Sequence, residues 1–255
     1  MDAQTGLTFP EMRLILDPPQ PGSWNMAVDE MLLRTAQVNK QAVLRLYQWN
    51  PATLSLGYFQ SYEEAQKHDC TQYVPWLRRT TGGGALLHDQ ELTYSLIFPS
   101  QYLSSQQIAY VYDLVHKSLI DTLQQFDIRA TIANPTQKPS EQQDTFLCFQ
   151  RRCACDVLLR DFKIAGSAQR RSHDYVLQHG SVLTRQSACA SELPGIYELS
   201  NSDMNADILQ AAWVPNLRKL FDTVFIEKPL TDEEKCVTAT IQASKFDADA
   251  WNMKR

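Results

Sequence analysis

The chain of 255 residues has no long hydrophobic run. A membrane-spanning helix needs roughly 18 consecutive apolar residues, and no stretch approaches that length. The segment from Met1 to Glu11 is polar and lacks the charged-then-apolar order of a secretory signal. Internal repeats and low-complexity segments are also absent. We therefore expect a cytoplasmic globular protein that does not contact membranes.

Positive charge is in short supply, since 24 Lys and Arg residues against 29 Asp and Glu residues give a net charge of −5. This balance does not favour a general nucleic-acid partner. The arginines include three adjacent pairs, Arg78–Arg79, Arg151–Arg152 and Arg170–Arg171. A single pair is commonly solvated surface, but a basic rim on an acidic protein suits an acidic or phosphorylated partner. We hypothesise that the three pairs form such a docking rim.

The six cysteines lack the spacing of a structural metal site. Cys153 and Cys155 are separated by one residue instead of the two of a zinc knuckle, and no second pair follows. We therefore predict no metal, and we expect these two thiols in a loop or on an edge strand. A cytosolic chain of this size is expected to keep its cysteines as free thiols.

Glycine is infrequent, with nine residues in the chain, yet three are consecutive. They are Gly82, Gly83 and Gly84. No Gly-Lys-Ser/Thr follows, as a P-loop requires, and the spacing does not fit a dinucleotide fingerprint. Such a backbone can approach a ligand and aim its N–H groups at a carbonyl, phosphate or oxyanion. A flexible turn is the alternative. Arg78 and His88 flank the loop and are candidate binding residues.

A second candidate segment, Lys163–Gln169, begins with a lysine and has small residues in its middle. Gly166 and Ser167 leave room for a ligand beside the backbone, so the lysine could reach into a groove. The alternative is an exposed lysine at a strand start. The next strand supplies further candidates, His179, Gly180 and Ser181. The histidine either lines the pocket or is a satisfied core residue.

Cys148 precedes Lys163 by fifteen residues. A thiol has a reference pKa of about 8.5, and a nearby cation lowers it. Lys163 would be such a cation, and a thiolate held by an ammonium attacks a thioester without a histidine base. The two residues therefore form a candidate dyad for moving an acyl group. The alternative is that Cys148 is a buried, inert cysteine.

Hairpins interleaved with a long helix predict an α+β fold with a mostly antiparallel or mixed β-sheet flanked by helices. The clearest helix spans about Ser105 to Phe126, because its apolar residues recur at spacings of three or four. No strong linker divides the chain, so we expect residues 1–255 to form a single catalytic domain with a helical segment from about residue 191. The expected strands are 12–16, 43–49, 53–58, 74–79, 92–98, 128–133, 156–160, 163–169 and 175–183.

Local signals refine this prediction. Ser23 is expected to cap the first helix. Asn50–Pro51 and Asp161–Phe162 are expected to form hairpin turns, and the polar segment Asn134–Thr145 a loop. Two capping boxes are expected to begin helices, Ser61-x-x-Glu64 and Thr231-x-x-Glu234.

The motifs together resemble the catalytic domain of the lipoate/biotin protein ligase superfamily. Within it, the chain is similar to the cysteine-dependent octanoyltransferases of lipoate assembly. The resemblance runs from about Met12 to the C-terminus. It rests on the combination of Asn25–Glu30, Trp49–Gln60, Arg78–Asp89, His88–Ser95, Lys163–Gln169, Gln178–Ser181 and Trp251–Arg255.

The resemblance implies an octanoyl group that arrives as a thioester on acyl carrier protein. It implies transfer through an acyl-cysteine at Cys148 to a lysine of a lipoyl domain, such as the glycine cleavage H protein. Lys163 matches the lysine that lowers the thiol pKa, and neither metal nor ATP is implied. The substrate would contact Arg78, Gly82, Gly83, Gly84, His88, Gly166, Ser167, His179, Gly180 and Ser181.

Two departures leave other activities open. Gly84–Ala85 resembles the loop of ATP-dependent lipoate–protein ligases, although Leu92 stands where those ligases carry an asparagine. The segment Arg151–Cys155 also differs from the octanoyltransferase pattern. The alternatives are therefore an ATP-dependent lipoate–protein ligase, a lipoyl or octanoyl amidotransferase between lipoyl domains, and a non-catalytic acyl-binding protein.

Overall fold

The structure is a computed structural model that describes residues 9–63, 73–101, 103–133 and 146–254. Within these residues, eight strands form a large sheet and three form a small one. The large sheet is ordered β11 (Val224–Glu227), β1 (Glu11–Leu16), β2 (Ala42–Tyr47), β6 (Glu91–Pro99), β10 (Tyr175–Leu183), β9 (Phe162–Ser172), β8 (Val157–Leu159) and β7 (Ala130–Ile132). The small sheet is ordered β4 (Trp76–Arg78), β3 (Thr53–Leu56) and β5 (Leu86–His88).

Most neighbouring strands run antiparallel. In the large sheet, only β1 pairs in parallel among the described strands, with β2 on one side and β11 on the other. The long hairpin of β9 and β10 pairs Gly180 with Ser167, and β10 also pairs along its length with β6. The α+β prediction with a mixed sheet is therefore confirmed.

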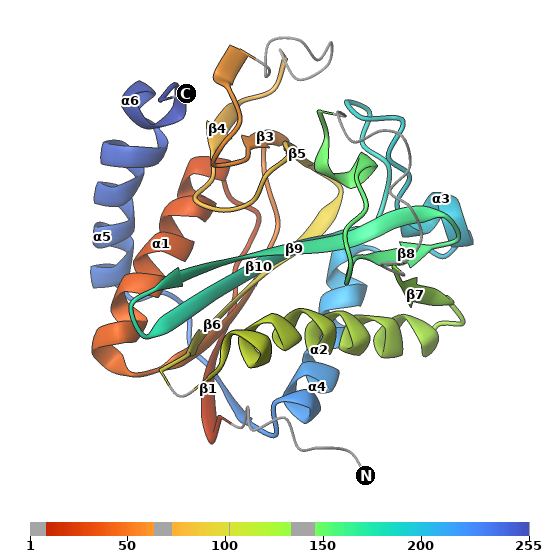
Figure 1. The fold of residues 1–255 in the computed structure, drawn as a ribbon, viewed down its shortest axis with the longest axis horizontal. Helices are drawn as coiled ribbons and strands as arrows, with labels where there is room; N and C mark the ends of the chain where they lie inside the picture. The colour runs from red at the N-terminus through yellow and green to blue at the C-terminus, as the bar shows by residue number, and fades with distance from the viewer. Residues whose placement is uncertain (1–8, 64–72, 102, 134–145, 255) are drawn as a thin grey trace.

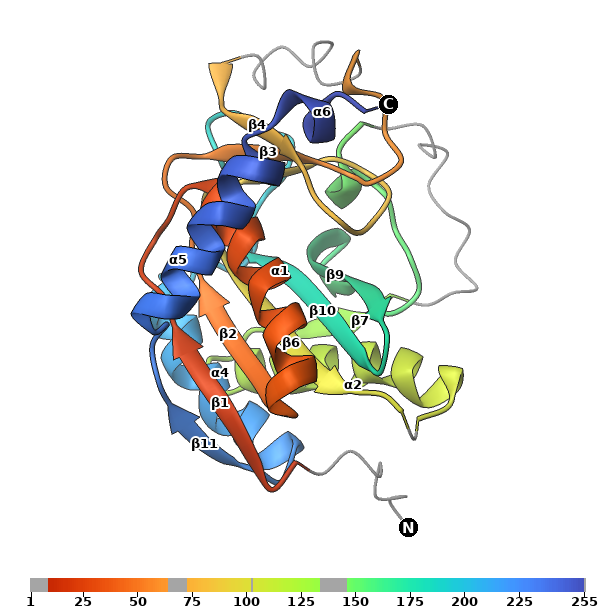
Figure 2. The same cartoon turned by 90° about the vertical axis from the view of Figure 1, so that its left-hand side faces the viewer.

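Helices cover both faces of the large sheet (Figures 1 and 2). One apolar core lies beneath α2 (Ser105–Gln124) and α4 (Ala206–Leu220), and a second lies beneath α1 (Gly22–Asn39) and α5 (Asp232–Ile241). The apolar residues that predicted α2 from their spacing are buried on one side of the helix. Ser104 is the N-cap of that helix and forms a capping box. Shorter elements are the 3₁₀ turn η3 (Cys148–Gln150), α3 (Ile196–Ser200), the π-helical turn η4 (Gln242–Phe246) and α6 (Asp249–Asn252).

Two predicted local features are wrong. Ser23 does not cap α1, because the N-cap position is Pro21 and the Ser23 hydroxyl instead accepts a hydrogen bond from Gln242. Asn50–Pro51 does not join a hairpin, because β2 lies in the large sheet and β3 in the small one. A turn signal shows where the chain bends but not which strand becomes its partner.

The β8–β9 turn lies one residue earlier than predicted. Arg160 has the positive φ of this turn, and Phe162 already belongs to β9. Thr231 caps α5 through Glu234, as predicted. The helical C-terminal segment is interrupted by β11, whose four residues were missed because so short an edge strand is defined by its distant partner β1.

Two expectations reach outside the described residues, namely the capping box at Ser61-x-x-Glu64 and the loop Asn134–Thr145. In the described part of the chain, no helix combines the length and apolarity needed to cross a bilayer.

Candidate active site

A cavity of about 310 Å³ lies where the large sheet, the glycine loop and the segment after η3 meet. Its walls include residues from β9 and β10, the two glycines Gly82 and Gly83, and the side chains of Cys148 and Lys163. The cavity therefore joins motifs that are far apart in the sequence. A third small core, built from the small sheet and Leu147, supports the wall that carries Cys148.

The backbone fixes Cys148 against the glycine loop. The Cys148 N–H donates to the carbonyl of Ala85 at 2.7 Å, and the Ala85 N–H donates to Phe146 at 3.2 Å. A Cβ placed on Gly84 would lie 3.1 Å from both Cα and Cβ of Cys148. Glycine at position 84 therefore allows the loop to lie directly against the thiol-bearing residue.

Lys163 is buried and directs its ammonium toward the thiol. Its Nζ atom lies 4.0 Å from Sγ of Cys148 and 2.9 Å from Oδ2 of Asp156. Burial lowers the pKa of Lys163, but electrostatic interactions with Cys148 and Asp156 outweigh burial and raise the pKa above its ordinary value. The lysine therefore stays charged at neutral pH, and the structure brings the predicted pair together.

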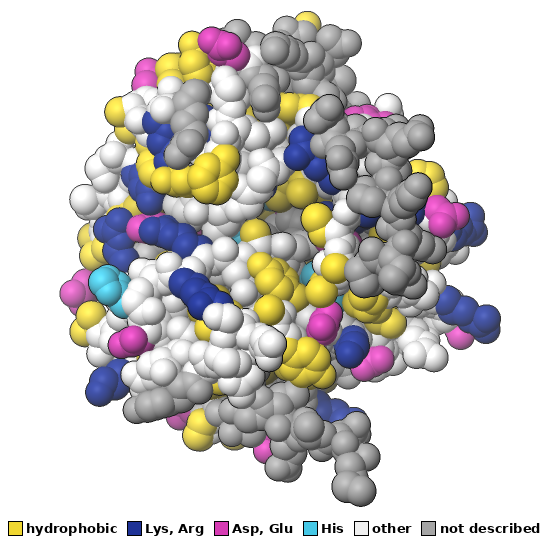
Figure 3. All heavy atoms as spheres, in the orientation of Figure 1, with side chains coloured by type: hydrophobic (Ala, Val, Ile, Leu, Met, Phe, Trp, Pro, Cys, Tyr) yellow, Lys and Arg dark blue, Asp and Glu magenta, His cyan; other side chains and the backbone are white. Residues whose placement is uncertain are grey.

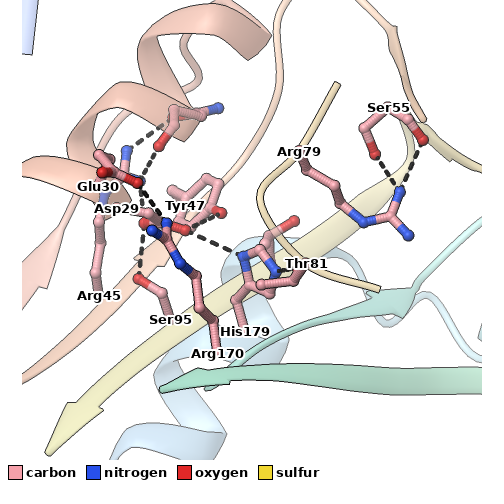
Figure 4. Close-up of polar contacts among 12 residues, drawn as sticks. Asp29, Glu30, Arg45, Tyr47, Ser55, Arg79, Thr81, Ser95, Arg170 and His179 are labelled. Atoms are coloured by element: carbon pink, nitrogen blue, oxygen red, sulfur yellow. Dashed lines mark hydrogen bonds and ion pairs between the residues drawn. The ribbon is translucent and has the colours of Figure 1, made fainter. Parts of the chain in front are cut away.

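The glycine loop is held from inside the protein by Arg79. The Arg79 guanidinium donates to the carbonyl of Gly84 at 2.5 Å. It also donates to the carbonyl and hydroxyl of Ser55 at 2.8 and 2.9 Å (Figure 4). Burial lowers the pKa of Arg79 to about 10, although Cys148 and Glu91 oppose the shift. Arg79 is thus a second cation near the thiol.

Arg78, the predicted binding residue, has a different environment. Its guanidinium donates to the carbonyls of Gly57, Gln60 and Asn252, and its side chain is fully buried. Arg79, and not Arg78, appears in the wall of the cavity. Sequence could not separate the two, because the direction of each side chain depends on how the chain leaves β4 at Arg78.

The structure contradicts the proposed arginine rim at Arg78–Arg79 and Arg170–Arg171, whereas its part at Arg151–Arg152 stays a prediction. Arg78 and Arg79 are buried, and Arg170 forms an ion pair with Glu30 at 2.6 Å. Arg171 lies on the opposite face of β9 and donates to Ser105. On the face shown in Figure 3, the described Lys and Arg side chains form separate groups, not one continuous rim.

His88 lines the cavity within a buried polar network. Its Nε2 lies 2.7 Å from the Ser55 hydroxyl, its Nδ1 lies 2.7 Å from Glu91, and its ring stacks on Trp49 at 3.7 Å. Burial lowers the pKa of His88, and the nearby carboxylate of Glu91 opposes this only in part. The ring is therefore neutral at physiological pH.

His179 also lines the cavity and joins two buried groups (Figure 4). Its Nδ1 lies 3.3 Å from Oδ2 of Asp29, and its Nε2 contacts the hydroxyl of Thr81 at the start of the glycine loop. Burial favours the protonated form of Asp29, but hydrogen bonding to His179 and the charge of Arg45 outweigh it and lower the Asp29 pKa. Both alternatives considered for His179 thus hold, since it is buried and faces the cavity.

The remaining predicted residues line the same cavity: Gly166, Ser167, Gly180 and Ser181. At Gly166, however, the space beside the backbone is filled by protein. A Cβ there would lie 2.6 Å from Cε of Lys163 and 3.1 Å from Oδ1 of Asp156. The small residue at position 166 therefore makes room for this ion pair at the edge of the cavity.

A sequence model of the lipoyl protein ligase A/B catalytic domain matches residues 21–229. The chain belongs to this family. Octanoyltransferase LipM of Clostridioides difficile (strain 630) is 30% identical over 271 residues, which cover 96% of this chain and 99% of that relative. Octanoyltransferase LipM of Geobacillus kaustophilus (strain HTA426) is 30% identical over 268 residues, which cover 92% and 95%. The resemblance inferred from the motifs is confirmed.

Solved structures agree on the fold of this lipoyl protein ligase A/B family member. A putative lipoate protein ligase from T. acidophilum with bound lipoic acid has a TM-score of 0.77 and 21% identity, covering 95% of this chain and 99% of that one. Lipoate-protein ligase A bound with ATP has a TM-score of 0.77 and 20% identity, covering 95% and 98%. At these identities the likeness concerns the fold alone.

Sequence reasoning missed Asp156, the carboxylate that contacts Lys163. Asp156 directly precedes β8, and the β8–β9 hairpin places Val157 opposite Ala165. If the pairing of these two strands had been predicted, it would have indicated that Asp156 lies beside the Lys163–Gly166 segment. Cys153 and Cys155 lie in the loop before it, as predicted, and the five described cysteines are free thiols.

Proposed function

We propose that this family member is an octanoyltransferase that carries the octanoyl group on Cys148. The observation that carries the proposal is the 4.0 Å separation of the Cys148 sulfur and the Lys163 ammonium in the wall of the cavity. The relatives named Octanoyltransferase LipM, which align over nearly the whole chain, support the choice of acyl group.

The first step is acylation of Cys148. The thiolate attacks the thioester carbonyl of the donor, and the charge that develops on oxygen is stabilised by the glycine-loop backbone and by Lys163. Collapse of the tetrahedral intermediate forms the Cys148 thioester and expels the donor thiolate, which takes a proton. Gly84 and Arg79 hold the loop against the thiol throughout this step.

The second step transfers the octanoyl group to the acceptor. The neutral amine of an acceptor lysine attacks the Cys148 thioester, the amine loses a proton, and the Cys148 thiolate leaves. Because Lys163 remains beside the sulfur, it stabilises the leaving thiolate as it stabilised the attacking one. We propose octanoyl-acyl carrier protein as donor and a lipoyl-domain protein, such as the glycine cleavage H protein, as acceptor.

The test is transfer of octanoate to a lipoyl domain with the Cys148→Ala variant. We expect loss of activity by at least about a thousandfold, because removal of an activated nucleophile removes the covalent route. Cys153→Ala is the matched control, since Cys153 lines the same cavity, and it should retain transfer. Full activity of Cys148→Ala would contradict the proposal.

The same preparation separates the other candidate activities. An ATP-dependent ligase would release pyrophosphate on addition of free lipoate and ATP and would tolerate Cys148→Ala. An amidotransferase would accept octanoate from an octanoylated lipoyl domain but not from the carrier protein. We expect ATP-independent transfer from the carrier protein.

A further inference from the structure

Two cysteines line the cavity that contains the Lys163 ammonium, and only one of them is the proposed nucleophile. Cys148 and Cys153 both line the cavity. The pKa of Lys163 responds to both sulfurs, with Cys148 the stronger influence and Cys153 the weaker. Cys153 is the more exposed residue of the two. Accessibility alone would therefore favour reaction at the wrong thiol.

Asp156 contacts both Cys153 and Lys163. Its Oδ2 accepts a hydrogen bond from the backbone N–H of Cys153 at 2.7 Å and lies 2.9 Å from Nζ of Lys163. The carboxylate thus lies against the Cys153 backbone, while the ammonium is directed to the Cys148 sulfur at 4.0 Å. The backbone of Cys153 is therefore bonded to the carboxylate, whereas the sulfur of Cys148 lies beside the ammonium.

We propose that Asp156 is a positioning residue that makes Cys148 the reactive thiol and suppresses Cys153. The inference rests on the proposed role of Cys148 as nucleophile. Asp156 acts in two ways: it keeps the buried Lys163 charged and aimed at Cys148, and its own charge disfavours a thiolate at Cys153. The first effect favours the thiolate of Cys148, and the second disfavours the thiolate of Cys153.

Direct repulsion between Asp156 and a Cys148 thiolate would work against this role. The charge state of Lys163 determines whether Asp156 favours or disfavours the Cys148 thiolate. A buried lysine without a counter-charge loses several units of pKa and becomes neutral near physiological pH. We expect loss of the cation that lies 4.0 Å from the sulfur to outweigh the relief of repulsion from Asp156, since Coulomb energy falls with separation. The raised pKa of Cys153, caused by burial first and by Asp156 next, agrees with the second effect.

Other titratable groups also face the cluster, and one of them, Arg151, opposes Asp156 by lowering the pKa of Cys153. Arg79 faces Cys148 from the glycine loop and stays charged, with a pKa of about 10. His116 faces Asp156 and Lys163 from α2, and burial lowers its pKa, so its ring is neutral at pH 7. The pKa of Cys155 is raised to about 12, by burial first and Asp113 next, so this thiol remains protonated.

The test compares alkylation of the two thiols in the full chain between pH 5.5 and 9, with iodoacetamide as probe and peptide mass mapping as readout. In Asp156→Asn we expect the rate at Cys148 to fall about tenfold at pH 7 and its pH midpoint to move upward. The rate at Cys153 should rise several-fold. Asp161→Asn is the control, because Asp161 is exposed in the adjacent turn, and both rates should stay within about twofold.

Opposite movement of the two rates separates a charge effect from loosened packing, which would raise both. A rise at both thiols, or faster reaction at Cys148 in Asp156→Asn, would overturn the proposal. Gly166→Ala is a second variant, because its Cβ would displace Lys163 and Asp156 together, and the Cys148 rate should fall there too. Alkylation needs no acyl donor, so the inference can fail while octanoylation of Cys148 persists, and the reverse also holds.

Discussion

At the scale of single residues, the site depends on glycines where the chain approaches itself. Gly84 lies against Cys148, Gly57 lies under the carbonyl of Gly83, and Gly166 lies under the Lys163–Asp156 pair. Each close approach fixes one reactive group relative to another. Displacement of such groups by a fraction of an ångström is costly, because catalysis depends on their mutual orientation.

Gly84→Ala should therefore lower the rate of Cys148 acylation about tenfold. The new Cβ would lie 3.1 Å from Cα and Cβ of Cys148, so the thiol-bearing backbone must shift by a few tenths of an ångström. Single-turnover acylation monitored by mass spectrometry measures the effect. Gly83→Ala, which meets no atom within 4 Å, should unfold at the same temperature as the parent. A Gly84→Ala protein that acylates at the parent rate would show that the close approach is unimportant.

At the scale of elements, the C-terminal helix α6 supports the glycine loop from outside. Oδ1 of Asn252 accepts the backbone N–H of Arg78 at 2.9 Å, and the Trp251 indole donates to the Arg78 carbonyl at 2.8 Å. Arg78 is the last residue of β4, and Arg79 follows it into the loop. The buried Arg78 therefore links α6 to the catalytic loop, which gives Trp251 and Asn252 a structural role.

We predict that Asn252→Ala destabilises the protein by about 2 kcal/mol, because it leaves the buried N–H of Arg78 without its acceptor. Urea unfolding at pH 7.5 measures this loss. Met253→Ala, at a neighbouring exposed position, should change stability by less than about 0.5 kcal/mol. Equal effects of the two substitutions would remove the case for α6 as a support.

Sequence patterns predicted the elements whose signals are local. The regularly spaced apolar residues of α2 and the capping box of α5 can be read directly from the sequence, and the structure contains both as expected. The separation of β3 from β2 and the addition of β11 beside β1 depend on partners far along the chain, so local patterns could not predict them. Cys148 and Lys163 were found through their motifs, whereas Asp156 and Arg79 became visible only when strand pairing and side-chain direction were known.

At the scale of the whole molecule, stability should fall with mild acid because His88 and His116 are buried and neutral. Burial lowers the pKa of both, so the unfolded chain binds more protons than the folded one below the ordinary histidine value of about 6.5. Stability is therefore fully present above about pH 6.5 and is lost as pH falls toward the folded pKa values. Between pH 7.5 and 5.5 the free energy of unfolding should therefore fall, with a contribution from each histidine.

Urea unfolding at the two pH values tests this prediction. His116→Gln should lose roughly half of the pH dependence, because one of the two buried imidazoles no longer takes up a proton on unfolding. The parent should have a lower free energy of unfolding at pH 5.5 than at pH 7.5. Equal stability at the two pH values would mean that the rings are protonated in the folded protein.

The most direct test of the account is the mass of the peptide that contains Cys148 after brief exposure to octanoyl-acyl carrier protein and an acid quench. We predict one added octanoyl group on that peptide, released by hydroxylamine as a thioester and discharged when a lipoyl domain is supplied. An octanoylated acceptor that forms while this peptide never carries the acyl group would contradict the account.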